Sequence, residues 1–373
     1  MTTPILILGA GLAGTTLAAR LVEEGATPSN LLVIDAADPH RGSSAPATML
    51  HPFPGRSMAP RQVQLDAFTE SFAWLDHIAR KLPDDWWLTA PMVRPLPEND
   101  KGHRLRDTWT DAHSNYPTEI ASRLLTPEDA RTSFPDLHLT TAALTYNPAA
   151  SVVVPRLIDH LQSSLQQAGA RFVRATATAI HGADQNWHIT LDDNTKLTAH
   201  RLVLAMGTGL LPLFPDLDLR TKAGEVLVLA PGKAELSAFV NADAHLFARR
   251  DGLWGLGSTY FPTHDWDHRD DAQVTRQLLD AITPHVPAAA GLRVEALWRG
   301  VRAIFGSDHL PLAGPVPGQT GLFVLGALGS KGLLFAPALA GQLATHLLHD
   351  QPLAAATHPD RITPKRWTFT PPS

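Results

Sequence analysis

Residues 5–35 read ILILGAGLAGTTLAARLVEEGATPSNLLVID, and this stretch decides the fold. Its first four residues form an apolar run that is typical of a buried parallel strand. The glycine-rich segment 9–14 follows directly, and apolar residues then recur at helical spacing as far as Gly25. A second apolar run, residues 31–34, ends in Asp35. The order strand, glycine-rich turn, helix, strand and acid predicts a βαβ unit.

Three glycines give this turn the pattern of a dinucleotide-binding site. Gly9 allows a sharp turn out of the strand, Gly11 lets a pyrophosphate approach the backbone, and Gly14 lets the helix pack closely against the sheet. The helix N-terminus offers free N–H groups and a positive dipole end to phosphates. Asp35 lies 21 residues after Gly14, where an acid is expected to accept hydrogen bonds from a ribose. The pattern favours FAD or NAD over NADP, and an ordinary βαβ unit with a glycine turn is the alternative.

Composition limits the class of protein. The chain has 373 residues, a net charge of −5 and no cysteine, which excludes disulfides, cysteine-ligated metals and cysteine nucleophiles. The negative charge gives no global attraction to nucleic acid or to an anionic membrane. We find no apolar run long enough for a transmembrane helix and no signal-peptide pattern. We therefore expect a soluble, cytoplasmic protein with no membrane partner.

The order of apolar runs predicts two interleaved domains. A doubly wound, nucleotide-binding pattern occupies residues 1–82, 141–220 and 301–373. Residues 83–140 and 221–300 look like a cap inserted twice, with aromatic residues set among prolines and a hairpin over residues 246–257. Helices are expected over 61–81, 156–168, 270–282 and 335–348. The last of these could also present its N-terminal N–H groups to a ligand.

Several further motifs carry a resemblance to a known family. They are the segments 43–50 (SSAPATML), 204–207 (LAMG), 300–302 (GVR), 308–314 (DHLPLAG) and 329–332 (GSKG). Together with the glycine turn, they resemble the FAD-dependent amine and D-amino-acid oxidase superfamily, which includes glycine oxidase and sarcosine oxidase. The similarity covers nearly the whole chain. It implies an α/β fold: a Rossmann-like FAD-binding domain of discontinuous segments with an inserted, mainly antiparallel β-sheet substrate domain.

One branch of that superfamily looks nearest. Segments 308–311, 329–333, 257–260 and 360–367 look like the oxidase half of the bifunctional enzyme that builds 5-methylaminomethyl-2-thiouridine in tRNA. Lys331 stands where that branch usually has arginine.

The glycine pattern and the resemblance together imply FAD as the cofactor. The residues expected to hold it are Gly9, Gly11, Leu12, Ala13, Gly14, Asp35, Ala36, Ser43, Ser44, Thr48, Met49, Ala177, Ala205, Gly207, Gly329, Ser330, Lys331, Gly332 and Leu333.

The resemblance also implies the chemistry. A flavin takes a hydride from a carbon next to nitrogen, and water then hydrolyses the imine. Arg302 matches an arginine that clamps the substrate carboxylate in glycine-oxidase-like members, and a guanidinium fork suits that task. Pairing with a structural acid is the alternative for Arg302. A cation at Lys331 would favour the anionic reduced flavin, and a solvated loop lysine is the alternative. Arg302 and Lys331 are therefore the predicted catalytic residues.

Other side chains have weaker functional interpretations. His51 could bond covalently to the flavin or be an ordinary loop histidine, and Trp254 and Tyr260 could line a pocket or belong to the core. His264, Asp265, Asp267 and His268 are of metal-ligating types, but their loop setting favours solvated side chains, so no metal site is predicted.

Three functions remain open at this point. The substrate could be the carboxymethylaminomethyl group of a tRNA wobble uridine, or a free amine such as glycine, sarcosine or a D-amino acid. A non-catalytic flavin-binding protein is the third. A basic face would favour tRNA, and its candidate residues are Arg104, Arg106, Arg249, Arg250, Lys365 and Arg366. The sequence does not predict the oligomeric state.

Overall fold

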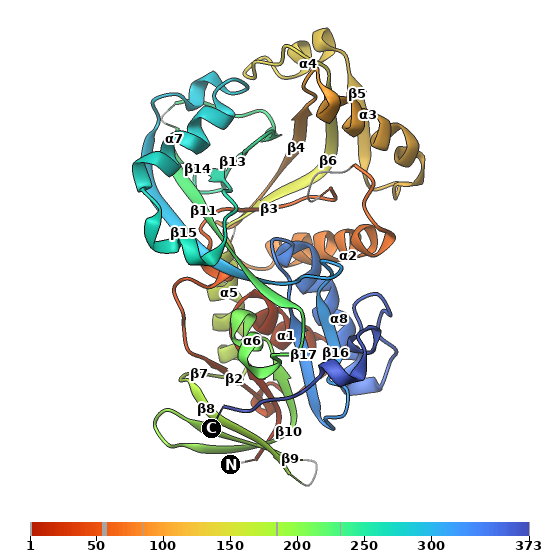
Figure 1. Cartoon of the computed structure of the whole chain (residues 1–373), viewed down its shortest axis with the longest axis vertical. Coiled ribbons are helices and arrows are strands. Elements are labelled where there is room, and N and C mark those ends of the chain that lie inside the picture. The colour runs from red at the N-terminus through yellow and green to blue at the C-terminus, as the bar shows by residue number, and fades with distance from the viewer. Residues whose placement is uncertain (1, 54–57, 84, 184–185, 232, 373) are drawn as a thin grey trace. The chain divides into compact units, whose positions relative to one another are not determined.

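The chain divides into two compact units (Figure 1). The computed structural model describes residues 2–53, 58–83, 85–183, 186–231 and 233–372. Unit 1 comprises Met1–Ser44, Leu157–Lys222 and Gly300–Ser373, and unit 2 comprises Ala45–Arg156 and Ala223–Arg299. This division gives residues 45–82 and 141–156 to unit 2, whereas the boundaries drawn from the sequence gave them to the nucleotide-binding domain.

Unit 1 is built on an eight-stranded sheet. Its main path has the order β16-β17-β10-β1-β2-β7, and β9 joins β8 to β10. The pairs β1–β2, β1–β10, β10–β17 and β2–β7 are parallel, as expected for a nucleotide-binding sheet. The strands are β1 (Thr2–Leu8), β2 (Leu31–Asp35), β7 (Arg171–Arg174), β8 (Ala177–Ala183), β9 (Asn186–Leu191), β10 (Lys196–Leu204), β16 (Leu312–Pro315) and β17 (Leu322–Gly326).

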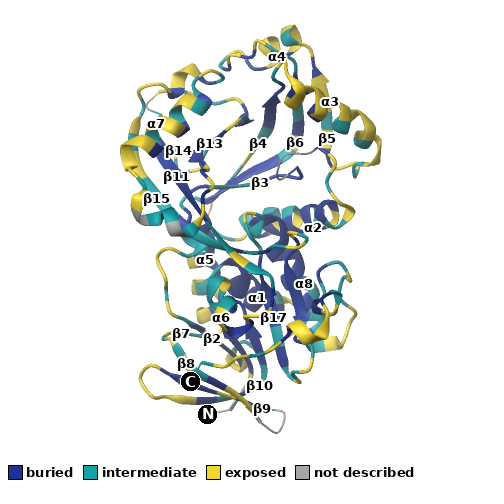
Figure 2. Ribbon diagram, in the orientation of Figure 1, coloured by how far each residue is buried: buried dark blue, intermediate teal, exposed yellow. Residues whose placement is uncertain are grey.

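Helices cover this sheet because its central strands are apolar on both faces. Four residues of these strands are 0% exposed: Leu6 and Ile7, at adjacent positions of β1 that face opposite sides of the sheet, and Leu31 and Val33 of β2. Figure 2 shows the strands as buried. The helices of unit 1 are α1 (Leu12–Glu23), α6 (Leu210–Leu213), α8 (Gly332–His349) and most of α5 (Val154–Gln167). Helix α8 includes the expected helix 335–348 and starts three residues earlier.

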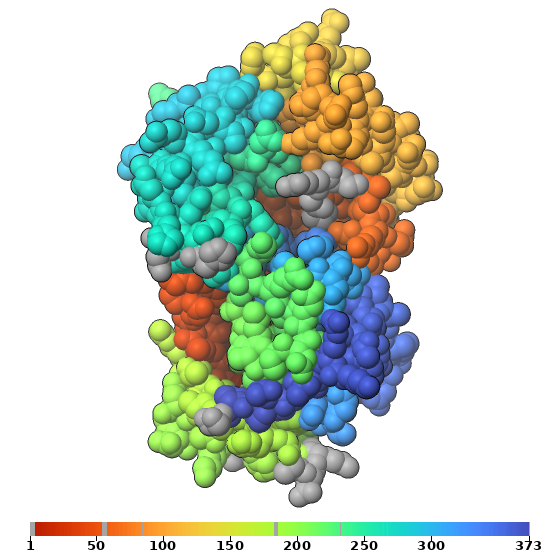
Figure 3. All heavy atoms as spheres, viewed as in Figure 1, coloured from red at the N-terminus to blue at the C-terminus, as the bar shows by residue number. Residues whose placement is uncertain are grey.

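The C-terminal segment closes one side of the unit 1 core. Trp367 packs edge-on against Phe214, with ring centroids 5.2 Å apart, and the Thr370 N–H donates to the Leu213 carbonyl at 2.9 Å. Figure 3 shows this segment, in blue, lying along the green residues around α6.

Unit 2 is built on a nine-stranded sheet. Its order is β15-β11-β14-β13-β12-β4-β6-β3, with β5 paired to β6. The strands are β3 (Thr48–Leu50), β4 (Trp87–Pro95), β5 (Ala121–Leu125), β6 (Ala143–Val152), β11 (Leu219–Ala230), β12 (Phe239–Asn241), β13 (His245–Ala248), β14 (Trp254–Gly257) and β15 (Arg293–Phe305). Its other helices are α2 (Gln62–Ala79), α3 (Asp100–Ala112), α4 (Pro127–Ser133) and α7 (Asp271–Ile282).

Most strand pairs of unit 2 are antiparallel, and β12–β4 is parallel. The predicted hairpin is present as β13 and β14, and Gly252 at its turn has a φ of +81°. One face of the sheet forms a hydrophobic core with α7, through Val93, Val240, Leu246 and Leu256 against Val274, Leu278 and Ile282. The predicted fold class, an α/β arrangement with a mainly antiparallel second sheet, is confirmed.

Candidate functional site

The chain turns sharply at the carboxyl end of β1, where Gly9 is required. Gly9 has a φ of +103°, and a Cβ on it would lie 2.3 Å from the carbonyl oxygen of Ala205. This crowding arises because Ala205 directly follows β10, the parallel neighbour of β1, and its N–H donates to the Leu8 carbonyl at 2.7 Å. Only a residue without a side chain fits this position.

Helix α1 starts close to the same turn. A Cβ on Gly14 would lie 1.8 Å from the Gly9 carbonyl oxygen, so the helix approaches the loop as closely as the sequence pattern predicts. Gly11 occupies the N-cap position and has no side chain to cap the helix. The N–H of Leu12 donates to Ser43 Oγ at 2.9 Å. Ser43 and Ser44, both predicted cofactor residues, lie in the short helical turn Gly42–Ser44.

Asp35 connects the end of β2 to the glycine loop. Its Oδ2 accepts the Ala10 N–H at 2.5 Å, and its Oδ1 accepts the Ala37 N–H at 2.7 Å. Arg41 forms an ion pair with Asp35 at 2.5 Å. A carboxylate has about four acceptor positions, so Oδ2 keeps room for a ribose hydroxyl. Ala36 is exposed between these contacts.

The second glycine-rich loop leads into helix α8. Gly329 has a φ of +57°, and a Cβ on it would lie 2.8 Å from Ile304 Cγ2 on β15. Lys331 is the N-cap residue of α8, and its Nζ donates to the His309 carbonyl at 3.2 Å. A Cβ on Gly332 would lie 3.5 Å from Leu12 Cδ2, at the start of α1. Leu333 is buried in the first turn of α8.

Helices α1 and α8 run side by side with their N-termini at the same end. Leu12 approaches Gly332 at that end, and the Arg20 guanidinium approaches Gly341 more than two turns further along both helices. Neither helix has an acidic residue in its first turn. Two positive helix ends with no carboxylate in their own first turns favour an anion.

Arg302 lies in unit 1 beside these loops. Its Nη1 donates to Ser330 Oγ at 2.8 Å, and a Cβ on Gly42 would lie 3.4 Å from its Cγ. The side chain is half-buried. Arg299, by contrast, binds the carboxylate of Glu225 at 2.9 Å, in unit 2.

The remaining predicted cofactor residues occupy several places. Gly207 has a φ of +57° just after β10, with no atom within 4 Å of a Cβ built on it. Ala177 starts β8 and packs against the unit 1 core. Thr48 and Met49 lie on β3 of unit 2, where the Thr48 hydroxyl donates to the Val152 carbonyl at 2.8 Å.

The predicted cofactor residues of unit 1 fit FAD. Backbone atoms leave no room for a Cβ at Gly9 or at Gly14 in the first turn of α1, and a Cβ at Gly11 would lie 2.8 Å from Ser43 Oγ. The starts of α1 and α8 suit a pyrophosphate, and Asp35 suits a ribose. When bound, FAD would supply a hydride acceptor for oxidation of the substrate.

Sequence reasoning missed two side chains that support this loop. Arg41 pairs with Asp35, and Gln162 on α5 donates from Nε2 to the Ala10 carbonyl at 3.1 Å. Arg41 follows the acid closely in a polar loop, which was a usable signal. Gln162 is 152 residues from Ala10 along the chain and gave no local signal.

Some weaker interpretations are wrong. Trp254 is 2% exposed and belongs to the unit 2 core, so it is not a pocket wall. Arg249 is buried and pairs with Asp251 at 2.5 Å, which removes it from any basic face. Tyr260 is 55% exposed, so it does not belong to the core. The side chains of His264 and Asp267 are outside the described residues, and the described residues contain no group of three or more His, Cys, Asp or Glu residues that could hold a metal.

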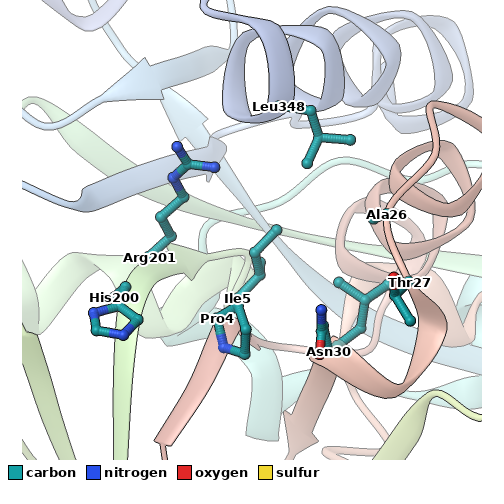
Figure 4. Close-up of a pocket in the computed structure, with 9 residues that line it drawn as sticks. Pro4, Ile5, Ala26, Thr27, Asn30, His200, Arg201 and Leu348 are labelled. Carbon is teal, nitrogen blue, oxygen red and sulfur yellow. The ribbon is translucent and has the colours of Figure 1, made fainter.

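A hollow lies at the other end of the unit 1 sheet (Figure 4). It is lined at the amino ends of β1 and β2, by residues that include Pro4, Ile5 and Leu31, and by Arg201 of β10. Its volume of about 280 Å³ is below the usual range for ligand pockets. Ligands of open α/β sheets bind at the carboxyl ends of the strands, so this hollow is separate from the candidate site.

No helix within the described part of the chain is both long and apolar enough to cross a membrane.

Comparisons with known proteins identify relatives of the chain. The chain is 31% identical over 241 residues to the tRNA 5-methylaminomethyl-2-thiouridine biosynthesis bifunctional protein MnmC of Caulobacter sp. (strain K31), covering 59% of the chain and 37% of that protein. It is 24% identical to the protein of the same name from Idiomarina loihiensis, covering 92% of the chain and 55% of that protein. The chain therefore spans about half or less of these relatives' length.

Among solved structures, glycine oxidase from Geobacillus kaustophilus matches the fold with a TM-score of 0.84 and 21% identity, covering 97% of the chain and 99% of that protein. The model of a protein family described as FAD dependent oxidoreductase matches residues 4–347, nearly the whole chain. The chain therefore belongs to the FAD dependent oxidoreductase family.

Proposed function

We propose that this FAD-dependent oxidoreductase oxidises a C–N bond of an amine that carries an N–CH2–COO⁻ group. The observation that carries the proposal is Arg302. It is held by Ser330, beside the loop 42–44 and the loop 329–332 of the candidate FAD site. A half-buried arginine fixed by a hydroxyl is oriented to grip a carboxylate through two hydrogen bonds.

The chain's own residues then have simple roles in this reaction. Arg302 binds the carboxylate and so positions the CH2 group. Lys331, the N-cap residue of α8, would supply a positive charge that favours the anionic form of the reduced flavin. The amine has to be neutral to react, and water hydrolyses the imine product.

Two carriers of the N–CH2–COO⁻ group are candidates. The first is the carboxymethylaminomethyl group of a tRNA wobble uridine. It is favoured because the relative matched over 92% of the chain is named for tRNA 5-methylaminomethyl-2-thiouridine biosynthesis. The second is a free amino acid such as glycine or sarcosine. The net charge of −5 and the burial of Arg249 favour the second, since both weaken the case for a basic tRNA-binding face.

The test is anaerobic reduction of the purified holoenzyme, monitored by the bleaching of the visible flavin band. Four substrates are offered in turn: undermodified tRNA that contains carboxymethylaminomethyl-uridine, then glycine, then sarcosine, then D-alanine. Bleaching by the tRNA alone identifies a modification enzyme, and bleaching by a free amino acid identifies a metabolic oxidase. A flavoprotein that none of these reduces would contradict the proposal.

Arg302→Gln tests the clamp. We expect the rate of flavin reduction at low substrate to fall by about 100-fold or more, because a charged bidentate contact is lost. The FAD content should not change. Arg293→Gln, on the exposed part of the same strand, is the matched control and should leave the rate unchanged. Equal rates for Arg302→Gln and wild type would remove Arg302 from the site.

A further inference from the structure

Two residues with left-handed backbone conformations lie at one end of the β16–β17 pair in unit 1. His309 precedes β16 and has a φ of +57°, and Ala327 follows β17 and has a φ of +56°. Leu312 is paired with Gly326, so both residues lie at the same end of the two strands. A residue with a Cβ adopts this conformation at a cost, and keeps it only where surrounding contacts hold it. Other parts of unit 1 must therefore hold these loops in place.

Lys331 connects the two loops. Its Nζ donates to the His309 carbonyl at 3.2 Å, so the side chain extends from the start of α8 to the loop 306–311. Its backbone N–H donates to the Leu328 carbonyl at 3.0 Å, which fixes the main chain at its base. A lysine has a flexible four-carbon stem, so a fixed backbone does not by itself place the ammonium group. The position of the ammonium group therefore depends on the position of the His309 carbonyl.

Asp308 shapes the loop that carries this carbonyl. Its Oδ1 accepts the Leu310 N–H at 2.8 Å, which is the local turn that an aspartate forms with the backbone two residues on. The His309 N–H donates to the Phe305 carbonyl at 3.1 Å. These two hydrogen bonds surround His309 on both sides and so orient its peptide groups.

Arg361 holds the same loop from the C-terminal segment. It lies in the short helical turn Pro359–Arg361, and its side chain is 15% exposed. Its Nε donates to Asp308 Oδ2 at 3.0 Å, and its Nη2 donates to the Leu310 carbonyl at 3.1 Å. The guanidinium carbon also lies 5.2 Å from the centre of the Phe305 ring. One guanidinium group therefore binds the residues on both sides of His309.

We propose that Arg361 and Asp308 are positioning residues that hold the Lys331 ammonium group at the start of α8. Arg361 fixes the loop, the loop presents the His309 carbonyl, and the carbonyl fixes the ammonium group. The inference rests on the proposed function, in which Lys331 supplies a positive charge to the reduced flavin. A charge that is already in place stabilises a developing negative charge better than one that has to move there, because no reorganisation is needed.

The test uses sulfite as a probe of the charge beside the flavin. Sulfite adds to oxidised flavin without turnover and leaves a negative charge on the ring, which a nearby cation stabilises. Each holoenzyme is titrated with sulfite, and the loss of visible flavin absorbance gives the Kd. We expect Lys331→Gln to weaken sulfite binding by about tenfold or more. Arg174→Gln, at an exposed position on β7, also loses one positive charge and should keep the wild-type affinity.

Asp308→Asn separates positioning from a direct effect of charge. The replacement removes a negative charge, so a direct effect on the flavin would tighten sulfite binding. Positioning predicts the opposite sign: without the ion pair to Arg361 the loop is held less firmly, and sulfite binding should weaken by about threefold or more. Asparagine keeps a side-chain oxygen that can accept the Leu310 N–H, so this variant tests the ion pair and keeps the turn.

Arg361→Gln should weaken sulfite binding to a similar extent. The double variant Arg361→Gln/Lys331→Gln should be no weaker than Lys331→Gln alone, because the loop then has no ammonium group to hold. Unchanged or tighter binding in Asp308→Asn, additive losses in the double variant, or a wild type that binds no sulfite would overturn the inference. If the Arg361 variants fail to fold, the sign of the change in Asp308→Asn decides it.

The two proposals fail separately. A protein whose flavin is reduced by sarcosine or by the tRNA, but whose sulfite affinity is unchanged in Lys331→Gln, keeps the proposed oxidation and overturns the positioning role. The expected order of sulfite affinities, in a protein whose flavin no amine reduces, supports the positioning role and contradicts the proposed function.

Discussion

At the scale of single residues, the glycine loop is where sequence pattern and structure agree most closely. Gly9 and Gly14 were expected to allow a sharp turn and close helix packing. The two positions are in fact crowded by backbone atoms, the Ala205 and Gly9 carbonyl oxygens respectively. Backbone cannot move aside as a flexible side chain can, so these two glycines are not replaceable.

Gly14→Ala should therefore prevent normal FAD binding. The new Cβ would lie 1.8 Å from the Gly9 carbonyl oxygen, so α1 or the loop has to shift. We expect the visible flavin absorbance per mole of purified protein to fall by about tenfold or more. Ser164→Ala, at an exposed position on α5 outside the predicted cofactor residues, is the control and should keep the full flavin content. A Gly14→Ala protein with a full flavin content would show that the loop has more freedom than the structure indicates.

Supporting contacts at this scale were less predictable. Asp35 was expected as a ribose acceptor, but its ion pair with Arg41 depends on how the polar loop folds back. Gln162 reaches Ala10 from α5, and only the packing of α5 against the loop brings the two together. Short sequence motifs describe the residues that touch a ligand better than the residues that support them.

At the scale of elements, periodicity predicted the amphipathic helices and missed a polar one. Helices α2, α5, α7 and α8 lie within a few residues of their expected ranges. Helix α3 was missed because it has no apolar face to give a periodic pattern. Only Gly102 and Leu105 among its residues are buried. Its start does have a local cause: the Asn99 side chain accepts from the N–H groups of Lys101 and Gly102.

Glu225 holds three segments of unit 2 together. Its side chain is 0% exposed and accepts hydrogen bonds from Thr259, Arg269 and Arg299. Burial alone would raise the pKa of Glu225, but the hydrogen bonds from Arg269, Thr259 and Arg299 hold it below its usual value. Sequence analysis expected only that Arg299 faces away from Arg302, and gave no signal for this cluster.

Glu225→Gln should destabilise the protein by about 3–5 kcal/mol, since it leaves two arginines at a buried site without their carboxylate. The free energy of unfolding, from urea denaturation of the holoenzyme, measures the change. Glu295→Gln removes a partly exposed ion pair with Arg293 and should cost about 1 kcal/mol or less. Similar losses in both variants would mean that Glu225 does not anchor these segments.

At the scale of the whole molecule, buried histidines make stability depend on pH. His51 has a pKa of about 3 in the folded protein, against 6.5 in an unfolded chain. Between these values the unfolded chain binds more protons, so folding stability falls as the pH drops below 6.5. His51 alone should account for about 3 kcal/mol of that loss by about pH 4.

His51→Gln removes this contribution, so its free energy of unfolding should decline less steeply below pH 6.5 than that of the wild type. Urea unfolding at a series of pH values measures both slopes. His103→Gln, at an exposed position on α3, should leave the wild-type slope unchanged. A His51→Gln slope equal to that of the wild type would show that His51 is not held neutral by burial.

The sequence by itself determined the nucleotide-binding loop, the presence of a second, mainly antiparallel sheet and the family. These follow from local rules: backbone geometry at glycines, apolar runs that need burial, and motifs that are contiguous in the chain. Tertiary structure decided what lies side by side: Arg41 with Asp35, Arg299 with Glu225, and the ring of His51 with that of His245. The physical reason is register. Strand pairing brings together residues far apart in the chain, and their burial and charge change only once they meet.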